Sequence, residues 1–281
     1  MTELIHDVRR ITLEQERRRG RAFLLAARVP KNLIGCHFDG LDVETWAHEQ
    51  LIDIFVLGSR NFQVDVADFR RVTANQPIKL LCSRDDHHSS DGYCTPPIQV
   101  LRGVWSNWYH LGTDGIQAMN FQYSSEPTHG AGEPHWPIHQ QALREMGDAE
   151  AIRWLDKTFV VARRGGGCGP QVVPNPEAWS TPRLFFSNTN MLAPLPATID
   201  DGGKVDTFLT LEVGDDVNRA SDKIDELRLR LLLSDPAASN LPPEQKIDRV
   251  FVREYMIPKR KARPNQKGTG PDYHWASPPA K

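Results

Sequence analysis

The chain has 281 residues, of which 39% are hydrophobic and 25% are charged. It is therefore long enough for one large domain or two modest ones, and a disordered chain is excluded. A formal net charge of -2 gives no support for nucleic acid as a partner. The sequence has no apolar run of the roughly 18 residues that a membrane helix needs, and no apolar signal-peptide core, so we expect a soluble protein without a membrane partner. Its compartment is not predicted.

The first half of the chain alternates helical and strand patterns. It opens with an amphipathic helix over residues 2–19, which Gly20 ends. Four apolar runs typical of buried strands follow, at residues 22–29, 52–58, 78–83 and 115–121. The segments between them predict helices at residues 43–51, capped by Asp42, and at 64–72 and 97–111. Each helix must carry the chain back before the next strand begins, so the alternation predicts a parallel sheet and an α/β fold.

The second half of the chain has a different pattern, with strand-like segments that follow one another without long helices between them. Residues 124–137 predict a loop, and residues 140–155 predict a helix broken near Gly147. Strands without long intervening helices are predicted at residues 157–164, 183–188, 205–213, 226–234 and 247–255. This pattern favours an antiparallel β-sandwich. We therefore expect domains at residues 1–155 and 156–258, followed by a flexible tail at 259–281.

The order and texture of these segments resemble the later part of family-10-like glycosyl hydrolases. The resemblance is carried by "RAFLLAARVP", "GLDVETWAHEQLIDIFVLGS", "IKLLCSRDDHHSSDGY", "PPIQVLRGVWSNWYHLGTDGIQAMNF" and "ALREMGDAEAIRWLDKTFVV", and it extends to about Val161. Those proteins have a (β/α)8 barrel followed by an all-β domain. The resemblance implies that the four predicted strands are the last four of the barrel and that the first four are absent. It also implies a carbohydrate ligand and no cofactor.

Two adjacent carboxylates, Asp85 and Asp86, follow the third predicted strand. Residues directly after a strand of a βα unit lie at the C-terminal face, where barrel enzymes build their sites. Because successive side chains of an extended chain diverge, one carboxylate is expected to face the cleft and the other a supporting partner. We predict that one of them acts as base, nucleophile or charge stabiliser in glycoside hydrolysis.

Further residues at strand ends, or in the loop after the third strand, are predicted to bind the carbohydrate. They are Arg28, Arg84, His87, His88, Tyr93 and Asn120. Histidine, asparagine and arginine can hydrogen-bond sugar hydroxyls, and Tyr93 can stack on a sugar ring. For Arg28 the sequence supports equally well an ion pair with a neighbouring acid at the rim.

The stretch around Asp85 has two other interpretations. Its residues could form helix caps and turns in a long loop, with no chemistry. The stretch also contains residue types that can bind a divalent ion, namely Asp85, Asp86, His87, His88 and Asp91. Adjacent histidines rarely converge on one ion, however, and no HxH or HExxH spacing supports them. No metal is therefore predicted.

Structural roles, without chemistry, are predicted for three aromatic residues and for the cysteines. Trp105, Trp108 and Tyr109 lie at i, i+3 and i+4 of a predicted helix, which is the spacing of core residues. The four cysteines have no metal-ligand spacing and are expected to be ordinary thiols.

Two functions from different classes stay open at the level of sequence. One is a glycoside hydrolase, whose second carboxylate would stand outside the predicted strands. The other is a non-catalytic carbohydrate-binding or structural protein. For either, the partner expected besides a carbohydrate is a missing half-barrel, or a second copy that associates through exposed strand edges.

Overall fold

The computed structural model describes residues 1–58, 61–85, 96–121, 136–163, 193–197, 207–217, 219, 222–234 and 250–256. The chain divides into two compact units, Met1–Asp216 and Val217–Lys281. No helix within the described ranges is long and apolar enough to cross a membrane. The domain boundary predicted at residue 156 stays a prediction.

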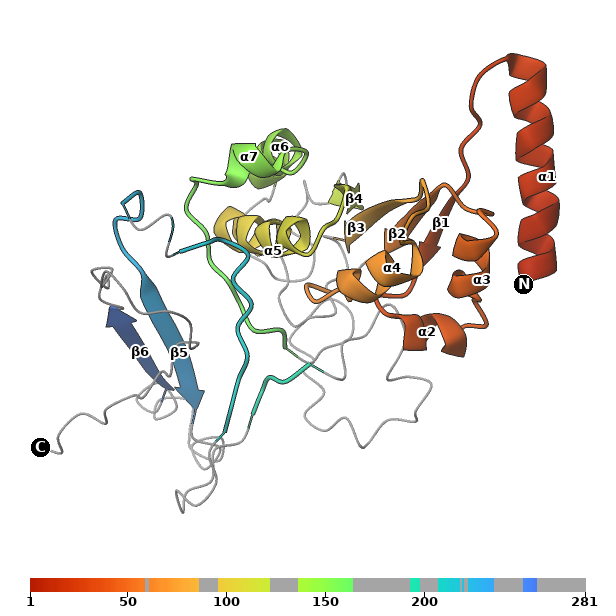
Figure 1. Ribbon diagram of the computed structural model, residues 1–281. Helices are drawn as coiled ribbons and strands as arrows, with labels where there is room; N and C mark the ends of the chain where they lie inside the picture. The colour runs from red at the N-terminus through yellow and green to blue at the C-terminus, as the bar shows by residue number, and fades with distance from the viewer. Residues whose placement is uncertain are drawn as a thin grey trace, which may run out of the picture. The chain divides into compact units, whose positions relative to one another are not determined.

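The first unit is built of alternating helices and strands (Figure 1). In chain order these are α1 Thr2–Arg19, β1 Ala26–Val29, α2 Leu33–Phe38, α3 Val43–His48, β2 Ile54–Leu57, α4 Val66–Val72, β3 Lys79–Asp85, α5 Ile98–His110, β4 Gly115–Met119, α6 Trp136–Glu145 and α7 Ala149–Ile152. The predicted α/β alternation is confirmed. Helix α2 was not predicted, although Asn32 caps it by accepting a hydrogen bond from the backbone N of Gly35 at 2.8 Å.

The four strands of the first unit form one parallel sheet in the order β1-β2-β3-β4. The register pairs Ala26 with Ile54 and Ile54 with Lys79. Leu81 of β3 pairs with Gly115 of β4. Spatial order therefore equals chain order, and the sheet contains no point at which the order reverses.

The helices pack on one face of this sheet and share a single hydrophobic core with it. Alternate residues of β2 and β3, such as Phe55 and Leu80, are fully buried in that core beside Trp46, Phe69 and Trp105 of the helices. Because side chains of a strand alternate between its faces, the intervening residues lie on the opposite face. We call this opposite face the second face; it carries Arg28, Val56, Ser83, Asp85, Gln117 and Met119.

Asp53, directly before β2, connects the amino-terminal end of the sheet to α1 by hydrogen bonds. Asp53 accepts hydrogen bonds from the backbone N of Leu25, at 2.7 Å, and from both terminal nitrogens of Arg9, at 2.7 and 3.0 Å. Helix α1 also contacts α3 through a hydrogen bond of 3.0 Å from Trp46 Nε1 to Thr2 Oγ1. These bonds fix α1 beside the start of β1 and β2.

An equivalent acid lies directly before β4. Asp114 accepts hydrogen bonds from the backbone N of Leu80, at 2.8 Å, and from Lys79 Nζ, at 3.2 Å, and it pairs with Arg70 of α4. Asp53 and Asp114 therefore join neighbouring parts of the sheet to a helical arginine in the same way. The amino-terminal edge of the sheet is held by charged, hydrogen-bonded groups.

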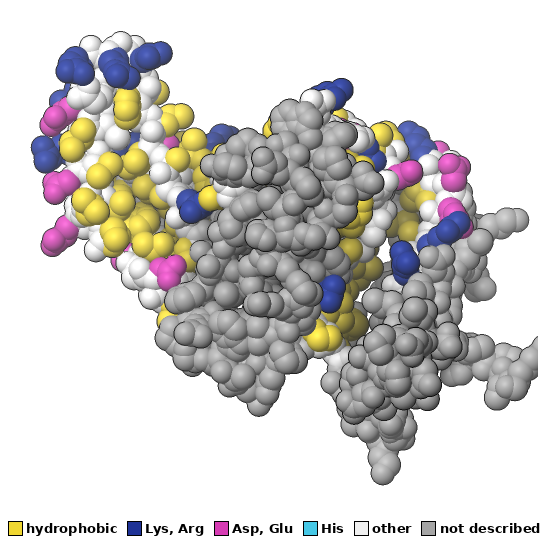
Figure 2. Space-filling model, turned by 180° about the vertical axis from the view of Figure 1, so that it is seen from behind, with side chains coloured by type: hydrophobic (Ala, Val, Ile, Leu, Met, Phe, Trp, Pro, Cys, Tyr) yellow, Lys and Arg dark blue, Asp and Glu magenta, His cyan; other side chains and the backbone are white. Residues whose placement is uncertain are grey.

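Part of α1 remains open to solvent. Leu4 and Ile11 are 56% and 50% exposed, although they belong to the apolar pattern that predicted the helix. Figure 2 shows apolar side chains gathered along this helix, with arginines at one of its ends. The helix bounds were predicted correctly, and Gly20 ends the helix with φ of 65°.

Residues 157–163 and 207–213 do not form the strands predicted for them. The backbone N of Thr158 donates to the carbonyl of Gln99 in α5 at 2.9 Å. Asn107 of the same helix donates to the carbonyl of Glu212 at 3.1 Å and accepts from the backbone N of Gly214 at 2.6 Å. Both segments are thus anchored to a helix, and their alternating pattern was misleading. The strand predicted at residues 183–188 lies outside the described residues.

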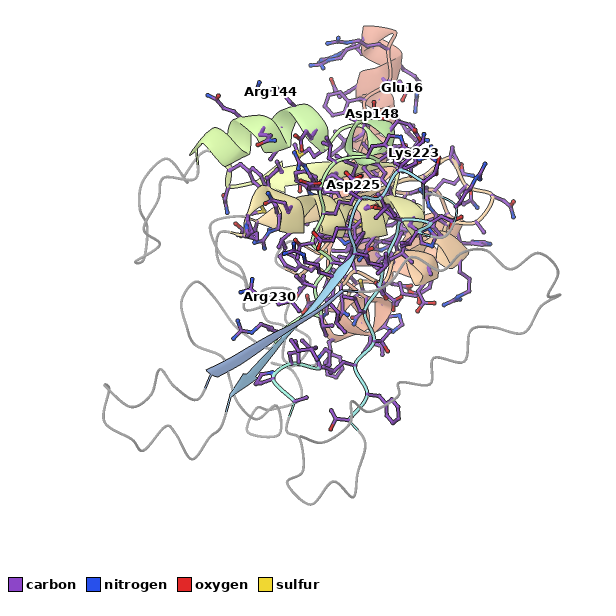
Figure 3. The ribbon with its side chains drawn as sticks, turned by 90° about the vertical axis from the view of Figure 1, so that its left-hand side faces the viewer. Glu16, Arg144, Asp148, Lys223, Asp225 and Arg230 are labelled. Carbon is purple, nitrogen blue, oxygen red and sulfur yellow. The ribbon has the colours of Figure 1, made fainter. Side chains whose placement is uncertain are left out.

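The second unit contains an antiparallel pair, β5 Arg228–Ser234 and β6 Val250–Met256. Leu231 pairs with Arg253 in its register. Figure 3 shows the side chain of Arg230 on β5. The two strands predicted here are confirmed, while the described residues of this unit form a two-stranded ribbon and show no sandwich.

The hydrogen bonds and ion pairs of Asp114 should stabilise the fold only while its carboxylate is charged. Burial alone would raise the pKa of Asp114, but hydrogen bonds from the backbone of Leu80 and from Arg70 and Lys79 outweigh it and lower that pKa. The charged form therefore stabilises the fold above the unfolded-state pKa of about 3.9. This contribution is lost as the pH falls through the lower folded-state pKa.

Asp114→Asn should accordingly reduce the free energy of unfolding by about 2 kcal/mol at pH 7 and by clearly less at pH 3. Urea unfolding at both pH values measures the difference. Asp7→Asn, which removes an exposed ion pair with Arg10, serves as the control and should change little at either pH. An equal loss for Asp114→Asn at both pH values would contradict the assignment.

The backbone at Thr158 crosses α5 in close contact with Gly103. A Cβ atom at Gly103 would overlap the carbonyl oxygen of Thr158, whereas one at Gly147 would meet nothing within 4 Å. We expect Gly103→Ala to lower the free energy of unfolding by about 2 kcal/mol, although alanine favours helix. Gly147→Ala should stay within about 0.5 kcal/mol of the wild type. Equal urea midpoints for the two variants would show that this crossing is not tightly packed.

Candidate functional site

The best-defined polar group at the carboxyl end of the sheet is Asp85. It is the last residue of β3, lies on the second face and is 0% exposed. Asn120, which follows β4, donates a hydrogen bond from Nδ2 to Asp85 Oδ1 at 2.9 Å. Asn120 has φ of 59°, a left-handed conformation that asparagine tolerates better than most residues. The carboxylate is thus held in a fixed position between two adjacent strand ends.

A second polar pair lies on the same face, two residues before Asp85 along β3. Ser83 Oγ donates to Gln117 Oε1 at 2.9 Å, and the two residues are partners in the register of β3 and β4. This pair was not predicted from the sequence. The available signal was one polar residue beside apolar residues in each strand, in "LLCS" of β3 and "GIQAM" of β4, but the register was needed to bring the two together.

Arg28 lies on β1, the outer strand farthest from β4, and its side chain extends over the second face. Its Nη1 contacts the Sδ of Met119, although β1 and β4 are the two outer strands. Three strand spacings of about 4.8 Å put the two backbones about 14 Å apart in a flat sheet. Side chains leave a sheet roughly perpendicular to it, so the contact indicates that the sheet curves toward the second face.

Arg84 lies on the helix-covered face, opposite to Asp85. It is 1% exposed, and its guanidinium lies over the ring of Phe62 with 4.9 Å between Cζ and the ring centroid. The carbonyl of Phe62 accepts a hydrogen bond from Trp108 Nε1 at 2.8 Å. The location of Arg84 supports a packing role beneath the loop between β2 and α4. Its predicted contact with a ligand stays a prediction.

The other predicted site residues lie outside the described residues. These are Asp86, His87, His88 and Tyr93, together with Asp91 of the metal alternative. Within the described part of the chain, no group of three or more His, Cys, Asp or Glu residues could hold a metal ion. The structure therefore brings together Asp85 and Asn120 of the predicted set, and it brings Arg28 onto the same face.

The predicted structural roles of the aromatic residues are confirmed. Trp105 and Trp108 are buried in the core, and Tyr109 donates from its hydroxyl to the carbonyl of Met146 at 2.6 Å. Cys36 and Cys82 are free and buried, and burial raises the pKa of each thiol to about 12. Neither of these two cysteines is suited to act as a thiolate nucleophile.

No protein-family model matches the chain, and no curated protein sequence matches it.

The hydrogen bond from Asn120 to Asp85 can be tested separately from the backbone conformation of Asn120. Glycine keeps the left-handed conformation and removes the bond, so Asn120→Gly should lower the free energy of unfolding by about 2 kcal/mol. Asn120→Ala should cost about 1 kcal/mol more, because alanine is strained in that conformation. Chemical unfolding of both variants measures these differences.

Asn75 offers a matched control, since it is exposed and also left-handed, with φ of 64°. Asn75→Gly should be neutral or slightly stabilising. If Asn120→Gly behaves like Asn75→Gly, the bond to Asp85 contributes nothing to stability.

Proposed function

We propose that the four-stranded sheet is an arc of a glycoside hydrolase-like (β/α)8 barrel and that a carbohydrate binds at the carboxyl end of its second face. Strand order equal to chain order, helices on one face and curvature toward the other are the features that support this. The remaining strands of the barrel would come from a further half-barrel or a second copy. The β5–β6 ribbon would belong to the appended all-β domain.

The observation that carries the proposal is the position of Asp85. A carboxylate held at the carboxyl end of a parallel strand, on the face away from the helices, is where barrel enzymes place catalytic groups. In the reaction Asp85 would act as base, nucleophile or charge stabiliser, with Asn120 fixing its orientation. Hydrolysis needs a second carboxylate, which would stand outside the four described strands, on the part of the barrel that completes the arc.

A second candidate function is carbohydrate binding without catalysis. Asp85 is the one carboxylate on the second face of the four described strands, and it is fully buried. A glycosidase distributes acid and base or nucleophile over two carboxylates. A single buried one suits a binding site in which Asp85 orders the polar groups around it.

The experiment is to make Asp85→Asn and Asp86→Asn singly and to assay both with the wild type against a panel of glycosides. For the enzyme, at least one variant should lose on the order of 10²–10⁴-fold in kcat/KM. Asp7→Asn, on the exposed side of α1, is the control and should keep full activity. If neither site variant loses more than about tenfold, the catalytic assignment is wrong.

The same panel separates the two candidate functions. Wild-type protein that binds an oligosaccharide without cleaving it would support the non-catalytic function. Urea unfolding of Asp85→Asn should accompany the assay, so that a loss of folded protein is not mistaken for a loss of chemistry.

A further inference from the structure

The arginine of β1 differs in what it contacts from three partly buried or buried arginines of the helices. Arg9 pairs with Asp53, Arg70 with Asp114, and Arg102 with Glu145. Arg28 is exposed, and in the described ranges its guanidinium contacts the Met119 sulfur and forms no ion pair with a carboxylate. The pairing of Arg28 with a rim acid, which the sequence allowed, is therefore not seen among these residues.

The thioether of Met119 holds the guanidinium without satisfying it. Sulfur is a weak acceptor and carries no charge, so it compensates neither the charge nor most of the N–H donors of Arg28. The planar guanidinium presents paired donors that match a carboxylate or a sulfate group. Arg28 therefore offers an anion-binding group over the second face.

The position of this group relates it to the candidate site. Met119 and Asp85 are partners in the register of β4 and β3, and such neighbouring strands lie about 4.8 Å apart. The register puts Arg28 in the row of Leu81, four residues before Asp85 on β3, and its guanidinium reaches the side chain of Met119. An anion on Arg28 would thus be bound within about two sugar residues of Asp85. The negative group of the sugar at the glycosidic bond, or of the next sugar along the glycan, can lie at this distance.

We propose that the carbohydrate of this site is acidic, a glycan with uronic-acid or sulfated residues, and that Arg28 binds its anionic group. The inference rests on the proposed carbohydrate site and specifies its ligand. The carboxylate of Asp85 is buried and accepts a hydrogen bond from Asn120, so part of its charge is compensated by a neighbouring donor.

The test is a binding measurement by calorimetry with two pairs of probes. One pair is an oligogalacturonate hexasaccharide and its carboxyl-reduced, neutral form; the other is a sulfated hexasaccharide and its desulfated form. The wild type should bind at least one acidic probe more tightly than its neutral counterpart, and added salt should weaken this binding. The pair that shows the difference identifies the anionic group.

Arg28→Gln should weaken binding of the acidic probe on the order of 10- to 100-fold, as expected for lost hydrogen bonds to a charged group. Its binding of the neutral probe should not change. Arg28→Lys keeps the charge but not the fork and should give an intermediate loss. The matched control is Arg18→Gln, which removes the same charge from the exposed end of α1 and should leave both affinities unchanged.

The outcomes distinguish this inference from the proposed function. Equal affinities for acidic and neutral probes, or an Arg28→Gln variant that binds the acidic probe like the wild type, would overturn the inference and leave a neutral carbohydrate site possible. Failure to bind any of these probes and any member of the glycoside panel would overturn the proposed function itself.

Discussion

A parallel sheet whose strands follow one another in chain order has all its connections on the same side, because each crossover has the same hand. In this chain α3, α4 and α5 connect successive strands, and they share one core with the sheet. This constraint divides the residues of every strand into two sets. Residues of one set pack in the core with the helices, and residues of the other set lie on the second face, which carries polar groups such as Ser83 and Asp85.

The two ends of the sheet are organised differently. At the amino-terminal end, Asp53 and Asp114 bind backbone nitrogens and helical arginines, so the charges there are compensated within the fold. At the carboxyl end, Asp85 is bound to Asn120, while Arg28 contacts a thioether. The amino-terminal end is thus held together by compensated charges, and the proposed function places recognition at the carboxyl end, as in parallel α/β proteins generally.

The sequence was sufficient where the signal is local. The bounds of α1 follow from its apolar spacing and Gly20, and the cap at Asp42 was read correctly because an N-cap depends on three residues only. It was insufficient where long-range contacts decide. Residues 207–213 alternate like a strand, yet the carbonyl of Glu212 accepts its hydrogen bond from Asn107, far away in the chain. The contact of Arg28 with Met119 depends on curvature of the whole sheet, which no local pattern encodes.

The two buried cysteines make the core observable in solution. Cys36 lies on α2 and Cys82 on β3, both on the side where helices meet the sheet. Because burial and a raised pKa suppress thiolate formation, alkylating reagents reach these sulfurs only when that layer opens. The rate at which each thiol is labelled therefore reports how often the helical layer separates from the sheet, at two places and without any engineered probe.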